Sequence, residues 1–296
     1  MSDWRALRLA VTQGQVEVVE QVMEDNGALA VSITDAADNP LFEPPPGAAP
    51  LWPLCQIQAI FGQDEDDSLI RAACHNALVA ALGDNAPNIV ISDIEDQDWT
   101  RVWMDAFQPM RFGQRLWIVP SWHPCPEPDA VNLRLDPGLA FGTGTHPTTA
   151  LCLEYLDSMA QMPDRVLDFG CGSGVLALAA LMLGAQQADG TDIDPQALLA
   201  MQDNAQRNDL DAHITTALPE DFSPQKPYPM VMANILSGPL QELAPVLSGH
   251  LEPDGYLVLS GLLVEQAEDV MAAYTDIDFD PPASSGEWCR LSGRKR

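Results

Sequence analysis

Lysine is almost absent from the sequence. Only Lys226 and Lys295 are lysines, and 14 basic side chains stand against 43 acidic ones, which gives a net charge of −29. A field of that sign repels phosphate backbones, so nucleic acid is excluded as a direct partner and a basic protein is favoured. Solubility or adaptation to a salty cytoplasm explains the acidity equally well.

Long apolar runs and patterned cysteines are also absent. The longest apolar stretch, Val175–Leu183, has nine residues, whereas a membrane-spanning helix needs about 20. The amino terminus lacks a basic start followed by an apolar run, so no secretory signal is visible. Six cysteines are scattered without a C-x-x-C pair, which argues against a zinc site or a disulfide framework. We therefore expect a cytoplasmic protein without a membrane segment or a metal.

The first 92 residues have the pattern of a small α+β domain. Apolar residues alternate over 7–11 and then recur at helical spacing over 16–23, where Asn26-Gly27 ends the helix. Further strands are expected over 29–33, 55–61 and 88–91, and a second helix over 70–81. This βαββαβ order is that of a ferredoxin-like sandwich. Residues 1–92 contain no catalytic constellation, so we interpret them as a substrate-recognition or structural domain.

An aromatic stripe follows this domain. Trp99, Trp103 and Phe107 lie four residues apart, which places them on one face of a helix. We expect a connector helix over 93–108. Its aromatic face packs on a neighbouring domain or sets the angle between the two domains.

Residues 109–296 predict an α/β domain. From Arg165 onward, short apolar strands (166–169, 188–192, 230–234 and 255–260) alternate with helical segments. That alternation is typical of a mostly parallel, doubly wound sheet.

A glycine loop follows the first of these strands. The segment 168–174 reads Asp-Phe-Gly-Cys-Gly-Ser-Gly. Glycines at a strand end let the backbone approach a ligand. Position 175 is Val175, so the spacing is G-x-G-x-G and not the G-x-G-x-x-G of nicotinamide-binding proteins. The loop indicates a nucleotide-like ligand, with a plain strand-to-helix turn as the alternative.

Two polar side chains lie at the ends of the next strands. Asp192 lies about 20 residues after the glycine loop, where a carboxylate can accept hydrogen bonds from both ribose hydroxyls. Asp194 precedes Pro195 and fits a helix N-cap better than a ligand. Asn234 ends the third strand, where its amide oxygen can accept from a substrate amine and orient the lone pair of the nitrogen.

Five segments together carry a resemblance to a known family. They are LDPGLAFGTGTHPTT, LDFGCGSGVLALAA, DIDPQAL, NILSGPL and EWCRLSGRK, in that order. This set resembles the bacterial ribosomal protein L11 methyltransferases over nearly the whole chain. The resemblance implies a ferredoxin-like domain that holds the ribosomal protein and a class I (Rossmann-like) methyltransferase domain. It also implies that Thr149, Gly170, Asp192 and Asn234 contact S-adenosyl-L-methionine.

The resemblance further implies methylation of lysine ε-amines, and of the N-terminal α-amine, on ribosomal protein L11. We expect the enzyme to be a monomer. The motifs alone indicate only the cofactor and a methyl acceptor. His146 is the nearest candidate for a general base, with a structural loop histidine as the alternative. Glutamine or adenine N-methyltransferases carry Asn/Asp-Pro-Pro-aromatic where this chain has Asn-Ile-Leu-Ser at 234–237. A non-catalytic factor that binds the ribosomal protein is the remaining alternative.

Overall fold

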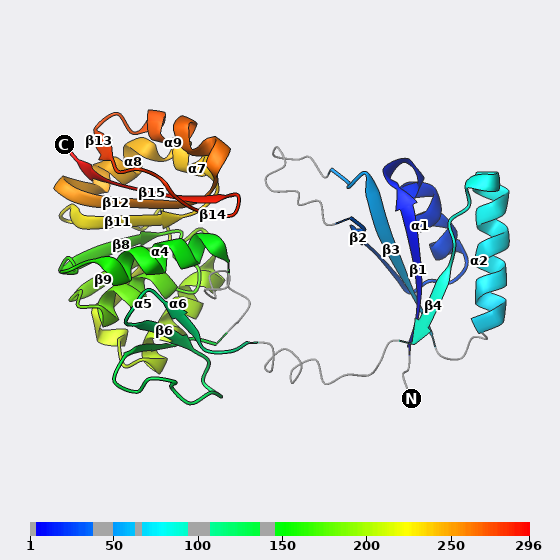
Figure 1. Ribbon diagram of the computed structural model, residues 1–296, viewed down its shortest axis with the longest axis horizontal. Coiled ribbons are helices and arrows are strands. Elements are labelled where there is room, and N and C mark those ends of the chain that lie inside the picture. The colour runs from blue at the N-terminus through cyan, green and yellow to red at the C-terminus, as the bar shows by residue number, and fades with distance from the viewer. Residues whose placement is uncertain (1–3, 38–49, 63–66, 94–106, 137–145) are drawn as a thin grey trace. The chain divides into compact units, whose positions relative to one another are not determined.

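The computed structural model describes residues 4–37, 50–62, 67–93, 107–136 and 146–296. The chain divides into two compact units, Met1–Val102 and Trp103–Arg296 (Figure 1). The helix expected over 93–108 falls on residues 94–106, outside the described part. Most of the segment LDPGLAFGTGTHPTT, namely residues 137–145, lies outside the described part as well.

The first unit is a four-stranded antiparallel sheet with two helices. Its six elements are β1 (Trp4–Thr12), α1 (Val16–Asp25), β2 (Ala30–Asp35), β3 (Leu54–Gly62), α2 (Asp67–Leu82) and β4 (Val90–Asp93). The strand order is β2-β3-β1-β4. Leu7, Leu9 and Val11 form one core cluster with apolar side chains of both helices. The alternation in the sequence thus predicts which face of β1 is buried, and Gly27 ends α1 at a φ of 94°.

The second unit is built on a doubly wound sheet. Its parallel strands are β8 (Arg165–Phe169), β9 (Gln187–Thr191), β10 (Ile214–Ala217), β11 (Tyr228–Asn234) and β12 (Leu251–Leu263). Three antiparallel strands extend it: β13 (Ile277–Phe279), β14 (Ala283–Ser285) and β15 (Trp288–Lys295). The order is β10-β9-β8-β11-β12-β15-β13, with β14 beside β15. The predicted doubly wound sheet is therefore confirmed.

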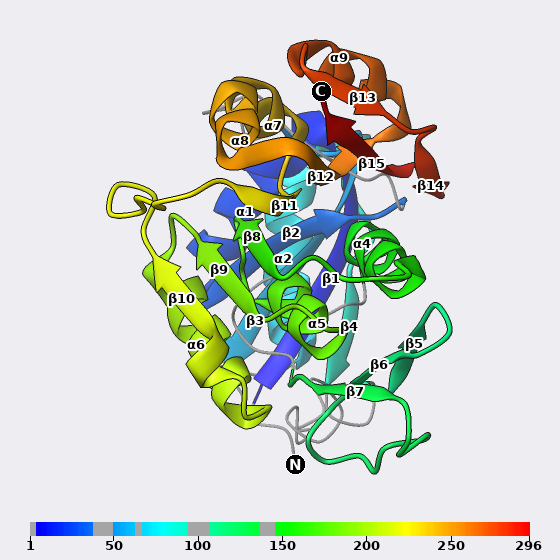
Figure 2. The same cartoon turned by 90° about the vertical axis from the view of Figure 1, so that its left-hand side faces the viewer.

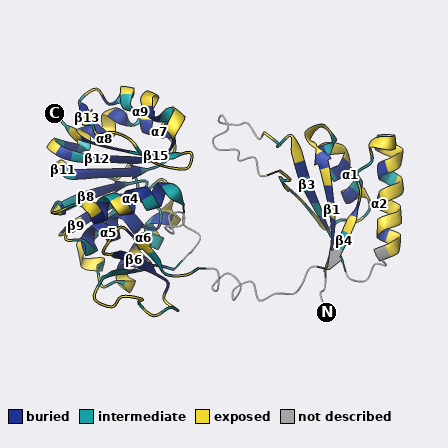
Figure 3. Ribbon diagram, viewed as in Figure 1, coloured by how far each residue is buried: buried dark blue, intermediate teal, exposed yellow. Residues whose placement is uncertain are grey.

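Helices cover both faces of this sheet, as Figures 1 and 2 show. One core cluster contains side chains of α4 (Pro147–Ser158), α5 (Val175–Met182) and α6 (Pro195–Arg207). The other contains side chains of α7 (Ser237–Glu242), α8 (Ala244–His250) and α9 (Ala267–Ala273). Strand residues alternate between the two, since Val258 joins the first cluster whereas Leu257 and Leu259 join the second. Figure 3 shows the result, with buried strands between helices that are exposed on their outer sides.

Smaller elements complete the description. A second sheet of the same unit contains β5 (Met110–Phe112), β6 (Leu116–Val119) and β7 (Val131–Arg134). Short 3₁₀ turns lie at Gln13–Gln15, Gly83–Asn85, Asp211–His213 and Val264–Gln266. Among the described helices, none has the length and apolar character to cross a membrane.

Candidate functional site

A cavity of about 610 Å³ opens at the carboxyl ends of the parallel strands. Its lining comes from the ends of β8, β9 and β11, from the loops that follow them, and from β12 and β15. Strand β8 lies between β9 and β11, so the strand order reverses at this place. Ligands of doubly wound folds bind at such a switch point, and the volume is typical of small-molecule sites.

The glycine loop forms one wall of the cavity. Gly170, Gly172 and Gly174 have φ angles of 77°, 52° and 78°, a region that favours glycine. A Cβ atom at Gly170 would lie 2.4 Å from Cγ2 of Ile235, and one at Gly174 would lie 2.4 Å from Cγ of Met201. Side chains at these two positions would displace their neighbours, so the G-x-G-x-G spacing is a structural requirement of this turn.

Asp192 connects the glycine loop to the end of β9. Its carboxylate accepts hydrogen bonds from the backbone N–H of Gly172 at 2.9 Å and of Asp194 at 3.0 Å. Each carboxylate oxygen keeps further acceptor capacity, and the residue lines the cavity. Asp194 caps α6 by accepting from the N–H of Gln196 at 2.9 Å, with Pro195 next to it. The predicted N-cap is confirmed.

Asp168 is a buried carboxyl group that the sequence analysis did not single out. It is 1% exposed, lines the cavity and accepts a hydrogen bond from the N–H of Ala177 at 3.1 Å. Burial raises its pKa from 3.8 to about 7, and the nearby negative charge of Asp192 adds to the rise. The carboxyl is therefore poised to change charge near neutral pH.

The raised pKa of Asp168 makes stability depend on pH. Above about pH 4 the unfolded chain has lost this proton, whereas the folded chain keeps it until about pH 7. The free energy of unfolding therefore falls over this range. Relative to the cofactor-free wild type, we expect the free energy of unfolding of Asp168→Asn to rise by about 3 kcal/mol between pH 5 and pH 8. Denaturant unfolding at both pH values measures this change, and a difference independent of pH would contradict it.

Asn234 and Thr149 lie together at the end of β11. Nδ2 of Asn234 donates to Oγ1 of Thr149 at 3.2 Å. Oδ1 of Asn234 is buried and has no hydrogen-bond partner among the described residues. Asn234 lines the cavity, whereas the fully buried Thr149 is absent from its described lining and Thr148 is present. Thr149 thus holds the Asn234 amide through this hydrogen bond, and the direct cofactor contact that the resemblance implies stays a prediction.

His146 caps the helix that carries these threonines. Its Nδ1 accepts from the backbone N–H of Thr148 at 3.4 Å and lies 2.7 Å from the Thr148 hydroxyl. Partial burial lowers the pKa of the ring, so the neutral form is favoured at pH 7. An accepting Nδ1 places the proton of that neutral ring on Nε2. The geometry therefore supports the structural role of His146 over the general base.

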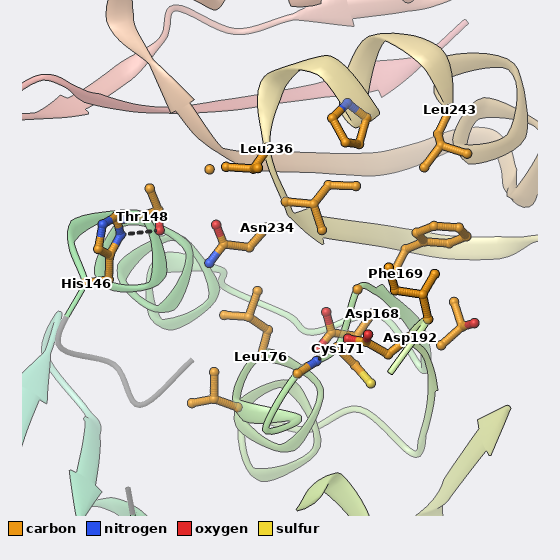
Figure 4. A pocket seen from close by; sticks show the side chains of 18 of the residues that line it. His146, Thr148, Asp168, Phe169, Cys171, Leu176, Asp192, Asn234, Leu236 and Leu243 are labelled. Carbon is orange, nitrogen blue, oxygen red and sulfur yellow. Dashed lines mark hydrogen bonds between the residues drawn. The ribbon is translucent and has the colours of Figure 1, made fainter. Parts of the chain in front are cut away.

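Three of the side chains that the sequence analysis singled out, those of His146, Asp192 and Asn234, line this cavity. Figure 4 shows His146 and Thr148 on one side of Asn234, and Cys171 and Asp192 on the other. Gly170 also lines it. The apolar lining was not expected, and neither was Trp288, the first residue of β15. No periodicity signals these residues, because most lie in loops or begin an element.

The residues of the cavity fit S-adenosylmethionine. The glycine turn leaves room for a ligand close to the backbone, and Asp192 stands where a ribose can be bound. Two buried oxygens among the lining residues, Oδ1 of Asn234 and Oγ1 of Thr191, have no partner in the described part of the chain. Such orphaned groups indicate a polar ligand. Fold and cavity together define an α/β methyltransferase domain of the S-adenosylmethionine-dependent type.

Comparison with known proteins identifies the family. The model of the ribosomal protein L11 methyltransferases (PrmA) matches residues 3–296. Proteins of that name from Pseudomonas aeruginosa (strain LESB58) and Ectopseudomonas mendocina (strain ymp) are 55% and 56% identical to this chain over 295 residues, 99% of each sequence. A crystal structure of ribosomal protein L11 methylase from Lactobacillus delbrueckii subsp. bulgaricus is 33% identical with a TM-score of 0.58, covering 64% of this chain and all of that one. The chain belongs to the ribosomal protein L11 methyltransferase family, whose cofactor is S-adenosylmethionine.

Proposed function

We propose that this chain methylates lysine ε-amines, and the N-terminal α-amine, of ribosomal protein L11. The observation that carries the proposal is Oδ1 of Asn234, a buried acceptor without a partner in the described residues that lines the cavity. An amine nitrogen is a donor that such an oxygen can fix in position. The names of the relatives identify the protein that carries the amine.

The glycine loop and Asp192 would hold the cofactor. Asp192 would accept hydrogen bonds from the ribose hydroxyls, and Gly170 and Gly172 would let the ligand approach the backbone. Asp168 lies close enough to Asp192 for the two charges to interact. When bound, the cofactor supplies an electrophilic methyl group on a sulfonium, which is a good leaving group.

The remaining tasks of the chain are alignment and exclusion of water. An amine with a pKa near 10.4 needs about 4–5 kcal/mol to become neutral at pH 7, and a desolvating cavity reduces that cost. Apolar side chains such as Phe169, Leu236 and Leu243 line this cavity. Oδ1 of Asn234 accepts an N–H of the neutral amine, so that its lone pair faces the methyl group.

We assign substrate recognition to residues 1–92, the connector to 93–108 and the chemistry to 109–296, in a cytoplasmic monomer. The first unit has the element order and the antiparallel sheet β2-β3-β1-β4 that a ferredoxin-like domain requires. The described part of the cavity lining comes wholly from the second unit.

Radiolabelled methyl transfer tests the proposed function. Purified ribosomal protein L11 is incubated with the full chain and labelled S-adenosylmethionine, and peptide mass analysis locates the methyl groups. We expect label on lysine side chains and on the terminal amine. Stable binding of L11 without label would support a non-catalytic binding factor, and label on glutamine would identify an amide methyltransferase.

The acidity of the chain predicts a salt effect. Residues 1–92 carry 13 acidic and 3 basic side chains, and the rest is acidic as well. A basic partner is attracted, and the Debye length falls from about 10 Å at 0.1 M salt to about 3 Å at 1 M. We expect association with L11 to slow at least about tenfold between these salts, with cofactor affinity changed by less than about threefold. Stopped-flow mixing measures the association rate. If this rate does not change with salt, the acidity serves solubility or halotolerance and not the attraction of L11.

A further inference from the structure

An aromatic pair lines the cavity on the side away from Asp192. The rings of Trp288 and His146 meet edge to face, with 4.6 Å between centroids and an interplanar angle of 72°. Both residues line the cavity. Figure 4 places His146 beyond Asn234 when viewed from Asp192. The cofactor-binding carboxylate and the aromatic pair are therefore separated by the amide that receives the acceptor amine.

The backbone holds Trp288 in place from two sides. In the β12–β15 ladder Trp288 is paired with Leu263, and in the β14–β15 ladder it is paired with Ser285. The N–H of Val264 donates to the carbonyl of the preceding residue, Glu287, at 2.8 Å. His146 is fixed in turn as the N-cap of α4. The backbone of Trp288 is thus fixed and its ring is in contact with His146, so less freedom is lost when a ligand binds.

We propose that Trp288 is a substrate-binding residue that takes the side chain of the acceptor lysine. The indole offers an apolar surface to the methylene stem and a π face to the amine cation, as aromatic rings do for methylated lysines elsewhere. Leu236, which is 47% exposed, lines the same cavity and adds apolar surface for the stem. The assignment rests on the proposed methylation of lysine.

The chemistry of the acceptor defines what Trp288 contributes. The lysine arrives as a cation and leaves as a methylated cation, whereas only the neutral amine reacts. The nitrogen becomes positively charged again as it gains the methyl group, so a π face stabilises bound substrate, transition state and bound product to a similar extent. Such an interaction lowers KM for the protein substrate and leaves kcat nearly unchanged.

Trp288→Leu separates this role from a structural one. We expect KM for ribosomal protein L11 to rise about tenfold, with kcat and the cofactor Kd within about threefold of wild type. Trp288→Phe retains an aromatic face, so its KM for L11 is expected to lie between that of wild type and that of Trp288→Leu. Trp117→Leu is the matched control, because Trp117 lies on β6 and is not part of the described cavity lining; its KM should equal that of wild type.

A probe cation tests the same site in the wild-type chain, where no variant has to fold. Tetramethylammonium chloride is expected to inhibit competitively against L11 and not against S-adenosylmethionine, beyond the effect of equal sodium chloride. Competition with the cofactor, or no excess over sodium chloride, would overturn the assignment, as would an unchanged KM in Trp288→Leu. Absence of methyl transfer by the wild-type enzyme would instead refute the proposed function.

Discussion

Replacing Asn234 by alanine is expected to lower kcat about 100-fold, because the amine then loses the acceptor that aims its lone pair. Oδ1 of Asn234 is one of the two orphaned buried oxygens among the described lining residues, and nothing at this position replaces it in the variant. We expect cofactor affinity to fall less than about tenfold. Single-turnover methyl transfer and calorimetric titration of the cofactor separate the two quantities. A variant with wild-type kcat would exclude Asn234 from the reaction.

Thr149 provides a matched pair of control variants for this experiment. Its hydroxyl accepts from Nδ2 of Asn234 at 3.2 Å and fixes which end of the amide faces the cavity. Thr149→Val removes the acceptor with little change in shape, so we expect about a tenfold loss of kcat. Thr149→Ser keeps the hydroxyl and should retain most activity. If Thr149→Val weakens cofactor binding and Thr149→Ser does not, the direct contact implied by the family resemblance is correct.

Replacing Asp192 by alanine is expected to weaken the binding of S-adenosylmethionine about 100-fold. Hydrogen bonds from ribose hydroxyls to a carboxylate contribute about 1.5–3 kcal/mol each, and a factor of ten corresponds to about 1.4 kcal/mol. The variant also removes the acceptor that holds the N–H of Gly172 at 2.9 Å, so the glycine loop loses an anchor. Titration calorimetry measures the affinity directly.

Asp194→Ala is the control for this variant. Asp194 lies two residues away with the same charge, but its side chain caps α6 and lies outside the described cavity lining. We expect a loss of about 1 kcal/mol in stability and a cofactor affinity close to that of wild type. If the two variants weaken the cofactor equally, the effect of Asp192 is one of charge alone, and ribose binding is not its role.

The sequence predicts the parts of the fold that follow a period or a local rule. The alternation of Leu7, Leu9 and Val11 predicts the buried face of β1, and Asp194-Pro195 predicts the start of α6. The sequence does not predict β10 as a strand, because two of its four residues, Thr215 and Thr216, are polar. This strand lies at the edge of the sheet. Strand β15 was missed because pairing with β12, and not its own pattern, makes it a strand.

The candidate site was predictable only where residues have fixed spacing. Gly170 and Asp192 follow predicted strands, and their chemistry is visible in the sequence itself. Trp288 is 54 positions from Asn234, and only the β12–β15 ladder brings it to the cavity. Asp168 was overlooked for another reason: its unusual property is a pKa raised by burial, which tertiary packing determines.

The place of β15 in the sheet affects how the enzyme is made. This strand lies between β12 and β13 and begins with Trp288, which lines the cavity. It is nevertheless the last of the described strands in chain order. A growing polypeptide emerges amino terminus first, so β8 to β12 are available for pairing before their antiparallel neighbour exists. Until residues 288–295 emerge, β12 presents an unpaired edge, which is a site of aggregation. Newly made chains therefore expose this edge of β12 until β15 has paired with it.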